Sequence, residues 1–264
     1  MARKIVITSG KGGVGKTTIT MGLGVALAKQ NQKVLLVDCD FFLNNLDLLF
    51  GIRQANYDLT DVMNGSCRMN QAIYSHKKFQ NLFILPSQKC GFNASFDKQR
   101  FFENICMVNA DYDFILFDCP SGTHSDFFLA TGVADEALVV VNPQISSMVV
   151  ANKLVSILNS KFDGKLGIII NNMRFDMVRS RKMLSHEQIG NMLKLPLAGV
   201  ISYFEEIESN MALYGQIDFS QKQISEQFNL LANNIYMGQN NIITPNKRIK
   251  IFSKIKKFFV GEGI

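Results

Sequence analysis

The sequence predicts an α/β fold in which a mainly parallel, twisted sheet carries helices on both faces. Three observations support this fold class. A glycine-rich loop lies between an apolar run and a helical pattern near the N-terminus. Further apolar runs without polar alternation recur along the chain, as is typical of strands buried on both faces. The chain of 264 residues is long enough for one large domain with a sizeable core.

Predicted strands and helices alternate along the chain. The run ARKIVITS is short, apolar and rich in β-branched residues, which predicts a first strand over 4–9. Residues 17–30 have helical apolar spacing and end in polar residues, which predicts a helix directly after the loop. The other apolar runs predict buried strands at 34–38, 82–86, 113–118, 136–142, 166–171 and 197–201.

The glycine-rich loop satisfies the phosphate-binding pattern G-x-x-x-x-G-K-[ST] through Gly10, Gly15, Lys16 and Thr17. Backbone N–H groups of such a loop cradle phosphates, the lysine reaches the β- and γ-phosphates, and the hydroxyl binds Mg²⁺. The alternative, a simple glycine-rich turn, is disfavoured because the strand and the helix follow in the required order. We therefore predict nucleotide contacts at Gly12, Gly13, Val14, Gly15, Lys16, Thr17 and Thr18.

Polar residues follow several of the predicted strands, where phosphate sites of parallel sheets lie. Asp38 and Asp40 end the second strand, with Asn45 shortly after, and Asp118 ends the fourth. We predict that Thr17 and Asp118 bind Mg²⁺, because an acid after an apolar strand is the usual partner of such a loop. We also predict nucleotide contacts at Asn45 and at Asn171, whose amide can read an adenine edge. The alternative is that each acid caps a following helix.

Net charge and cysteines exclude several classes of protein. Six of the 28 basic residues but only one of the 22 acidic residues lie in 247–264, so the rest of the chain is nearly neutral and nucleic acid is an improbable partner. The five cysteines form no C-x-x-C pair, which argues against a zinc site or a disulfide framework and for a reducing cytosol. No run reaches the roughly 18 apolar residues of a membrane span, and the N-terminus is not a signal peptide.

The C-terminal residues form a separate unit. We predict an ATPase-type domain over 1–236, a flexible linker over 237–246 and a basic tail over 247–264. On a helix, lysines occupy one side of the tail, and the opposite side carries Ile251, Phe252, Ile255, Phe258 and Phe259. A basic amphipathic helix with aromatic residues on its apolar side is typical of binding to a membrane surface. A helix docked on the domain and a nucleic-acid tail are the alternatives.

The loop KGGVGKTT, with Lys11 directly after its first glycine, resembles the deviant Walker A motif of the MinD/ParA family of P-loop ATPases. The likeness covers residues 3 to about 200, and the stretches VDCDFFLNNLDLLFG, FILFDCPSG and NPQISSM carry it further. The stretch 57–87 favours the branch of the family that places the cell-division septum. The resemblance implies a cytoplasmic enzyme that hydrolyses ATP with Mg²⁺ and binds the inner face of the cell membrane.

The resemblance also implies roles for individual residues. Two subunits would sandwich two ATP molecules, and Lys11 would cross the interface to the partner's phosphates, where a mobile charge neutralises a transferring phosphoryl group. Lys16 would serve its own subunit, Asp40 would orient the attacking water, and Asp38 would lie near Mg²⁺ together with Asp118. Regulators of the MinC/MinE type are the implied partners besides the homodimer and anionic lipid.

The sequence departs from the family pattern at three places. Ile201 is followed by Ser-Tyr-Phe instead of Pro-x-[DE], Val149 and Val150 replace a charged pair, and Gln144 stands where glutamate is common. Three alternatives therefore stay open. These are an FlhG-like ATPase that sets flagellar number, although no N-terminal extension precedes the first strand, a ParA-like partitioning ATPase, and a nucleotide-dependent scaffold with little hydrolysis. Iron–sulfur carrier relatives are disfavoured because the chain has no C-x-x-C.

Overall fold

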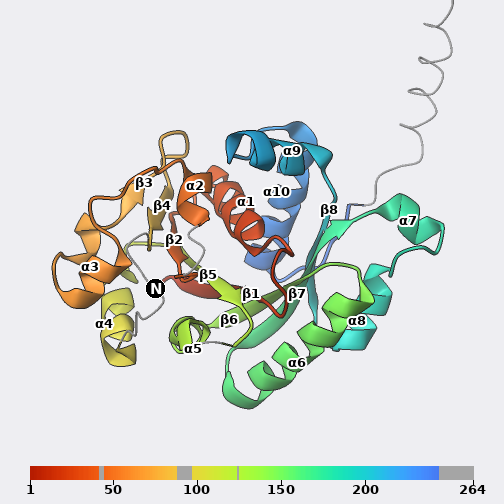
Figure 1. Ribbon diagram of the computed structural model, residues 1–264, viewed down its shortest axis with the longest axis horizontal. Helices are drawn as coiled ribbons and strands as arrows, with labels where there is room; N and C mark the ends of the chain where they lie inside the picture. Colours follow the sequence, from red (N-terminus) through yellow and green to blue (C-terminus); the bar gives the residue numbers. More distant parts are fainter. Residues whose placement is uncertain (42–44, 88–96, 124, 244–264) are drawn as a thin grey trace, which may run out of the picture.

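The computed structural model describes residues 1–41, 45–87, 97–123 and 125–243. In these ranges, eight strands form one sheet in the order β3-β4-β2-β5-β1-β6-β7-β8 (Figure 1). Every neighbouring pair is parallel except β3 with β4. The strands are β1 (Arg3–Ser9), β2 (Val34–Asp38), β3 (Tyr74–Ser75), β4 (Leu82–Leu85), β5 (Phe114–Ser121), β6 (Glu136–Val141), β7 (Lys165–Met173) and β8 (Leu197–Ser202).

Helices cover both faces of the sheet, as the apolar strands require (Figure 1). The helices are α1 (Lys16–Lys29), α2 (Leu46–Phe50), α3 (Leu59–Asn64), α4 (Lys98–Val108), α5 (Ser125–Thr131), α6 (Ile145–Lys161), α7 (Phe175–Arg179), α8 (His186–Leu193), α9 (Glu205–Tyr214) and α10 (Lys222–Met237). Apolar residues of α1, α2 and α10 pack on one face. Residues of α3, α4, α5, α6 and α8 pack on the other. The predicted fold class is confirmed.

The sheet is mainly parallel, as predicted from the continuous apolar runs. Such runs are typical of strands that helices bury on both faces. The strand β2 is buried at each of its five positions, and β6 at each of its six. The seven predicted strands are present, with shifts of up to three residues at their ends. The strand β3 was not predicted, because it has two residues and, in the described part of the chain, pairs with β4 alone at the edge of the sheet. So short an edge strand leaves no periodic signal in the sequence.

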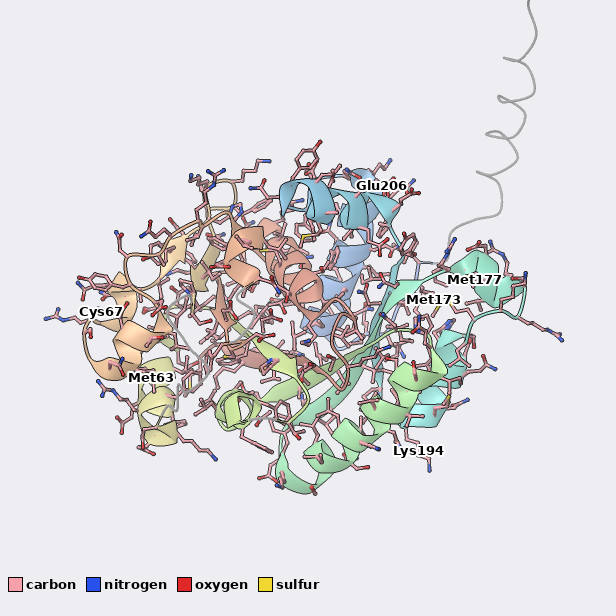
Figure 2. The ribbon with its side chains drawn as sticks, viewed as in Figure 1. Met63, Cys67, Met173, Met177, Lys194 and Glu206 are labelled. Carbon is pink, nitrogen blue, oxygen red and sulfur yellow. The ribbon has the colours of Figure 1, made fainter. Side chains whose placement is uncertain are left out.

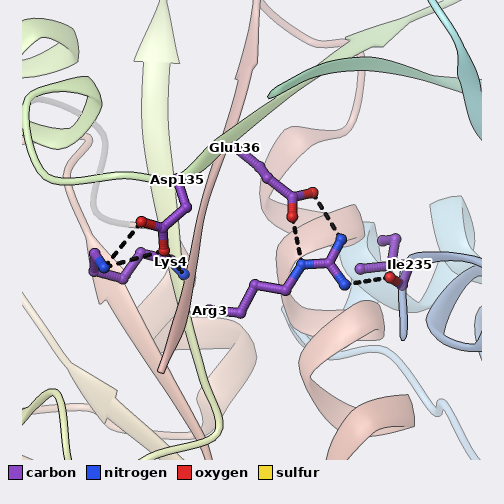
Figure 3. A network of polar contacts seen from close by, with 5 residues as sticks. All are labelled: Arg3, Lys4, Asp135, Glu136 and Ile235. Carbon is purple, nitrogen blue, oxygen red and sulfur yellow. Dashed lines mark hydrogen bonds and ion pairs between the residues drawn. The ribbon is translucent and has the colours of Figure 1, made fainter. Parts of the chain in front are cut away.

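An ion-pair network joins the amino ends of the central strands to α10 (Figure 3). Arg3 of β1 forms a bidentate ion pair with Glu136 of β6 and donates to the carbonyl of Ile235 in α10. Next to it, Lys4 pairs with Asp135 at 3.0 Å. Both pairs link β1 to the start of β6, so they fix the sheet at the edge opposite to the glycine-rich loop.

The last described residues follow α10 closely. The side-chain amide of Asn234 donates to the carbonyls of Ala198 and Asn241, at 2.9 Å each. Ile242 then packs partly against the core. The first part of the predicted linker therefore contacts the domain, and the domain boundaries stay a prediction. Among the described residues, no helix combines the length and apolar character needed to cross a bilayer. The predicted membrane-binding residues of the tail lie outside the described ranges.

Candidate functional site

The glycine-rich loop joins the carboxyl end of β1 to the N-terminus of α1. Gly13 and Gly15 have φ angles of 74° and 93°, in the left-handed region that favours glycine. Gly15 immediately precedes α1, and a β-carbon there would collide with the amide of Asn171. A β-carbon at Gly10 would lie 2.7 Å from the carbonyl oxygen of Val150 in α6. The loop is therefore a close-packed turn whose N–H groups precede a helix dipole, a geometry that suits phosphate.

The side chain of Asn171 holds this loop from the neighbouring part of the sheet. Its Nδ2 donates to the carbonyl oxygen of Val14 at 2.8 Å, and Val14 and Asn171 are both buried. A buried backbone carbonyl needs such a partner, so β7 fixes the shape of the loop. We expected Asn171 to read an adenine edge. That role stays a prediction, and the structure adds a second one that the sequence analysis did not include.

Asp118, which lies within β5 and three residues before its end, contacts the first turns of α1. Asp118 accepts a hydrogen bond from the hydroxyl of Thr17, and the hydroxyl of Thr20 lies 3.0 Å from its Oδ1. Lys16 is buried, and its charge acts on the same carboxyl. Burial raises the pKa of Asp118 to about 6, and the Thr17 hydrogen bond and the Lys16 charge oppose this rise. The structure thus brings Lys16, Thr17 and Asp118 together, while their roles toward nucleotide and Mg²⁺ stay predictions.

Thr20 was missed by the sequence analysis. It lies one helical turn after Lys16, three residues after Thr17, and therefore on the same side of α1. A threonine four residues after Lys16 was the signal in the sequence that could have identified it. Its contact with Asp118 required the packing of α1 on β5, which the sequence does not display.

A second buried acid lies beside Asp118. Asp38 and Asp118 are paired in the register of β2 with β5, and both are almost fully buried. Oδ1 of Asp38 accepts from the backbone N–H of Asp40 at 3.0 Å, whereas Oδ2 is buried and has no hydrogen-bond partner among the described residues. Burial, followed by the charge of Asp118, raises the pKa of Asp38 well above its ordinary value.

These groups fit a divalent cation. Two adjacent carboxylates that are costly to ionise alone, one with an unpartnered oxygen, become stable when a cation neutralises them. Together with the hydroxyl of Thr17 they offer oxygen ligands only, and oxygen is what Mg²⁺ prefers. No cluster of three or more His, Cys, Asp or Glu residues suited to hold a metal by themselves occurs in the described ranges. A Mg²⁺ ion here would thus share its coordination with phosphate and water.

The other predicted contacts occupy less buried positions. Asp40 is half-buried and close enough to Asp118 for its charge to raise the pKa of that carboxyl. Asn45 is exposed at the start of α2, directly after residues outside the described ranges. Gly12 and Gly13 are exposed at the turn of the loop, and Thr18 is half-buried in α1. Their contacts with nucleotide stay predictions.

Lys11 is exposed at the tip of the loop. Its backbone carbonyl accepts from the hydroxyl of Ser9 at 2.7 Å, which fixes the main chain while the side chain faces solvent. Exposed apolar residues of α6, Ile145 and Val149, belong to the helix against which Gly10 packs. A lysine that serves another subunit needs such a position.

The segment that departs from the family pattern is held by α10. Ser202 donates its backbone N–H to Oε1 of Gln227 at 2.6 Å, and Nε2 of Gln227 donates to its hydroxyl at 2.8 Å. A proline at 202 would lack this N–H donor. The centroid of the Tyr203 ring lies 5.3 Å from the guanidinium carbon of Arg174, and the Tyr203 hydroxyl donates a hydrogen bond to Oε2 of Glu208. Gln227 was not predicted from the sequence.

Comparisons with known proteins agree with this site. A protein-family model described as an AAA domain matches residues 2–166. The septum site-determining protein MinD of Thermotoga maritima is 34% identical over 271 residues, covering 97% of this chain and 100% of that protein. The MinD of Synechocystis sp. is 38% identical over 202 residues, covering 76% of each.

Solved structures show the same likeness. The chain superposes on a MinC:MinD cell division protein complex of Aquifex aeolicus with a TM-score of 0.81 and 34% identity, over 94% of this chain and 99% of that one. A septum site-determining protein MinD of Pyrococcus horikoshii complexed with Mg-ADP gives a TM-score of 0.77 and 33% identity, over 89% and 96% of the two chains.

Proposed function

Because the chain belongs to the MinD family of septum site-determining ATPases, we propose that it cycles between a free form and a homodimer bound to the membrane surface. It is a division-site ATPase that binds and hydrolyses ATP with Mg²⁺. The observation that carries the site assignment is the contact of Asp118 with Thr17 and Thr20 beside the buried Lys16. This contact unites the phosphate loop with the metal-binding acid.

Each residue of the site has a proposed task in hydrolysis. N–H groups of residues 12–18 and the ammonium of Lys16 would bind the phosphates, while Thr17, Asp38 and Asp118 would hold Mg²⁺. The ion, when bound, neutralises charge on the β- and γ-phosphate oxygens. Asp40 orients the attacking water through its half-buried carboxylate. Asn171 keeps the loop in shape through Val14.

Dimerisation follows from the position of Lys11. Lys11 is exposed at the tip of the loop, whereas Lys16 is buried beside Asp118. We assign Lys11 to the phosphates of a second subunit, where it neutralises charge that develops in the transition state. Nucleotide binding and dimerisation are then linked equilibria, so each strengthens the other.

Membrane binding is assigned to the tail, residues 247–264. One amphipathic helix binds a bilayer weakly, because ordering its residues opposes the burial of its apolar side. Two tails in one dimer make the second insertion intramolecular, so avidity strengthens attachment when ATP is bound. Hydrolysis then releases both the dimer and the membrane. We propose a protein of the MinC type as a partner, because the chain resembles the MinD of a MinC:MinD complex, and a MinE-type regulator that acts on the dimer.

One experiment tests this cycle in three variants. ATP-dependent dimerisation is measured by light scattering, and membrane binding by sedimentation with anionic liposomes. Lys16→Ala should lose nucleotide binding altogether. Lys11→Ala should bind nucleotide as a monomer and fail to dimerise or sediment. Equal loss of nucleotide affinity in both variants would contradict the division of roles between the two lysines.

The third variant tests the tail. Phe252→Ser combined with Phe259→Ser keeps every charge but removes aromatic area, so it should dimerise with ATP and lose most sedimentation with liposomes. A deletion of 247–264 serves as the control for complete loss. Sedimentation of the double variant at the parent's level, or a preference of the parent for DNA over liposomes at physiological salt, would refute a membrane-binding tail.

A further inference from the structure

Two cysteines lie side by side directly after the two metal-binding acids. Cys39 follows Asp38, Cys119 follows Asp118, and the backbone N–H of Cys39 donates to the carbonyl of Asp118 at 2.9 Å. The register that pairs Asp38 with Asp118 places the two cysteine side chains next to one another in the same part of the core, and burial, followed by the neighbouring Cys119, raises the pKa of the Cys39 thiol. Both are free in this structure and fully buried. The sequence analysis found only scattered cysteines, because β2 and β5 become neighbours only in the folded sheet.

The thiols and the acids lie on opposite faces of the sheet. Side chains alternate along a strand, and Cys39 and Cys119 belong to the core that faces α4, α5 and α6. Asp118 contacts α1 on the other face. A change in the direction of either cysteine side chain therefore rotates the backbone that joins it to the preceding residue, which is Asp38 or Asp118.

We propose that Cys39 and Cys119 form an oxidisable dithiol, and that its disulfide displaces Asp38 and Asp118 and weakens Mg²⁺-dependent nucleotide binding. Neighbouring strands lie about 4.8 Å apart, within the range of Cα separations that disulfides span. The consequence for nucleotide rests on the proposed roles of Asp38 and Asp118, whereas the formation of the disulfide does not.

Hydrogen peroxide is the oxidant that suits buried thiols, because it is small and polar. The buried hydroxyls of Thr8, on the strand next to Cys119, and of Ser87, just beyond the end of β4 next to Cys39, have no hydrogen-bond partner among the described residues. They offer hydrogen-bonding capacity to a small polar molecule at both ends of the thiol pair. Larger oxidants, such as small-molecule disulfides, would reach the thiols only if the carboxyl ends of β2 and β5 opened more widely.

Two thiols and one hydrogen peroxide give one disulfide and two molecules of water. One thiol attacks a peroxide oxygen, the O–O bond breaks, and the thiol proton and the departing hydroxide form water, leaving a sulfenic acid. The second thiol attacks that sulfur, the S–O bond breaks, and its proton and hydroxide form the second water. Two electrons leave the two sulfurs and reduce one peroxide. Buried thiols react slowly, so we expect exposed Cys106 to be oxidised first.

The test uses the full chain with three substitutions, Cys67→Ser, Cys90→Ser and Cys106→Ser, so that only the pair remains. Cys67 lies beside α3, at the outer end of the molecule (Figure 2), so its substitution lies far from the thiol pair. The protein is treated with peroxide, its remaining thiols are blocked, and its peptides are mapped by mass spectrometry. Circular dichroism follows folding, and affinity for ATP is measured with and without Mg²⁺ before and after dithiothreitol.

We expect a peptide that joins Cys39 to Cys119, and a loss of about tenfold or more in Mg²⁺-dependent ATP affinity, reversed by dithiothreitol. Cys119→Ala and, independently, Cys39→Ala should bind Mg-ATP normally when reduced and resist the loss. Folded protein whose pair stays reduced after Cys106 of the parent is fully oxidised would overturn the proposal, as would a cross-linked protein with unchanged affinity. Failure of the reduced protein to bind Mg-ATP would instead refute the proposed function.

Discussion

Replacing Asn171 by alanine separates two roles that one side chain is given. The amide donates to the carbonyl of Val14 at 2.8 Å, in a region where both residues are buried. Without it, a buried carbonyl loses its partner, which costs about 1–3 kcal/mol. For a chain of this length, each kcal/mol lowers Tm by about 2 °C. We therefore expect Asn171→Ala to lower the Tm of the nucleotide-free protein by a few degrees.

The assay compares thermal unfolding with affinity for ATP and for GTP. If Asn171 mainly fastens the loop, both affinities fall by a similar factor, because both nucleotides place their phosphates on the same N–H groups. If it mainly reads the base, the preference for ATP over GTP is lost. Asn234→Ala is the matched control. Its buried amide also donates to backbone carbonyls, but far from the loop, so it should lower Tm and leave nucleotide affinity intact.

An unchanged Tm of the nucleotide-free Asn171→Ala protein, together with lost discrimination between ATP and GTP, would refute the reasoning. It would show that the contact with Val14 contributes nothing to the empty loop and that the amide acts on the base alone. Equal affinity of variant and parent for both nucleotides, at unchanged Tm, would remove Asn171 from the site.

Three further predictions concern the site and its support. Burial raises the pKa of Asp118 from 3.8 to about 6, so the folded protein holds this proton more tightly than the unfolded chain. The stability of the nucleotide-free protein should therefore fall as pH rises from about 4 to about 6, and Asp118→Asn should raise it at pH 7 by up to about 3 kcal/mol in urea unfolding while weakening Mg-ATP binding. Loss of stability in that variant at pH 7 would contradict the burial argument. Asp40→Ala should lower ATP turnover about 100-fold or more and leave ATP-dependent dimers intact, and near-normal turnover would remove its role. Gly22→Ala should cost about 1–3 kcal/mol because its β-carbon would collide with the ring of Phe228, whereas Gly190→Ala, in open space on α8, should be neutral or stabilising in the same assay.

Local sequence was sufficient for most of the fold. Continuous apolar runs predicted seven strands because a strand buried on both faces must be apolar at every position. The glycine-rich loop, with Lys16 and Thr17, predicted the phosphate site because its glycines and its lysine stand within one short segment. Asp118 was predicted in the same way, from an apolar run that ends in an acid, although β5 itself continues to Ser121. Each of these signals is contained in fewer than about a dozen neighbouring residues.

Contacts between distant segments depended on the strand order. The hydrogen bond from Asn171 to Val14, the contact of Thr20 with Asp118 and the pairing of Cys39 with Cys119 join residues far apart in the chain. They exist because β5 lies between β2 and β1, while β7 lies beyond β6. Apolar strands of similar composition pair almost equally well with one another, so their sequences do not encode which become neighbours. The packing of helices on both faces of the sheet selects that order, and with it the side chains that meet at the site.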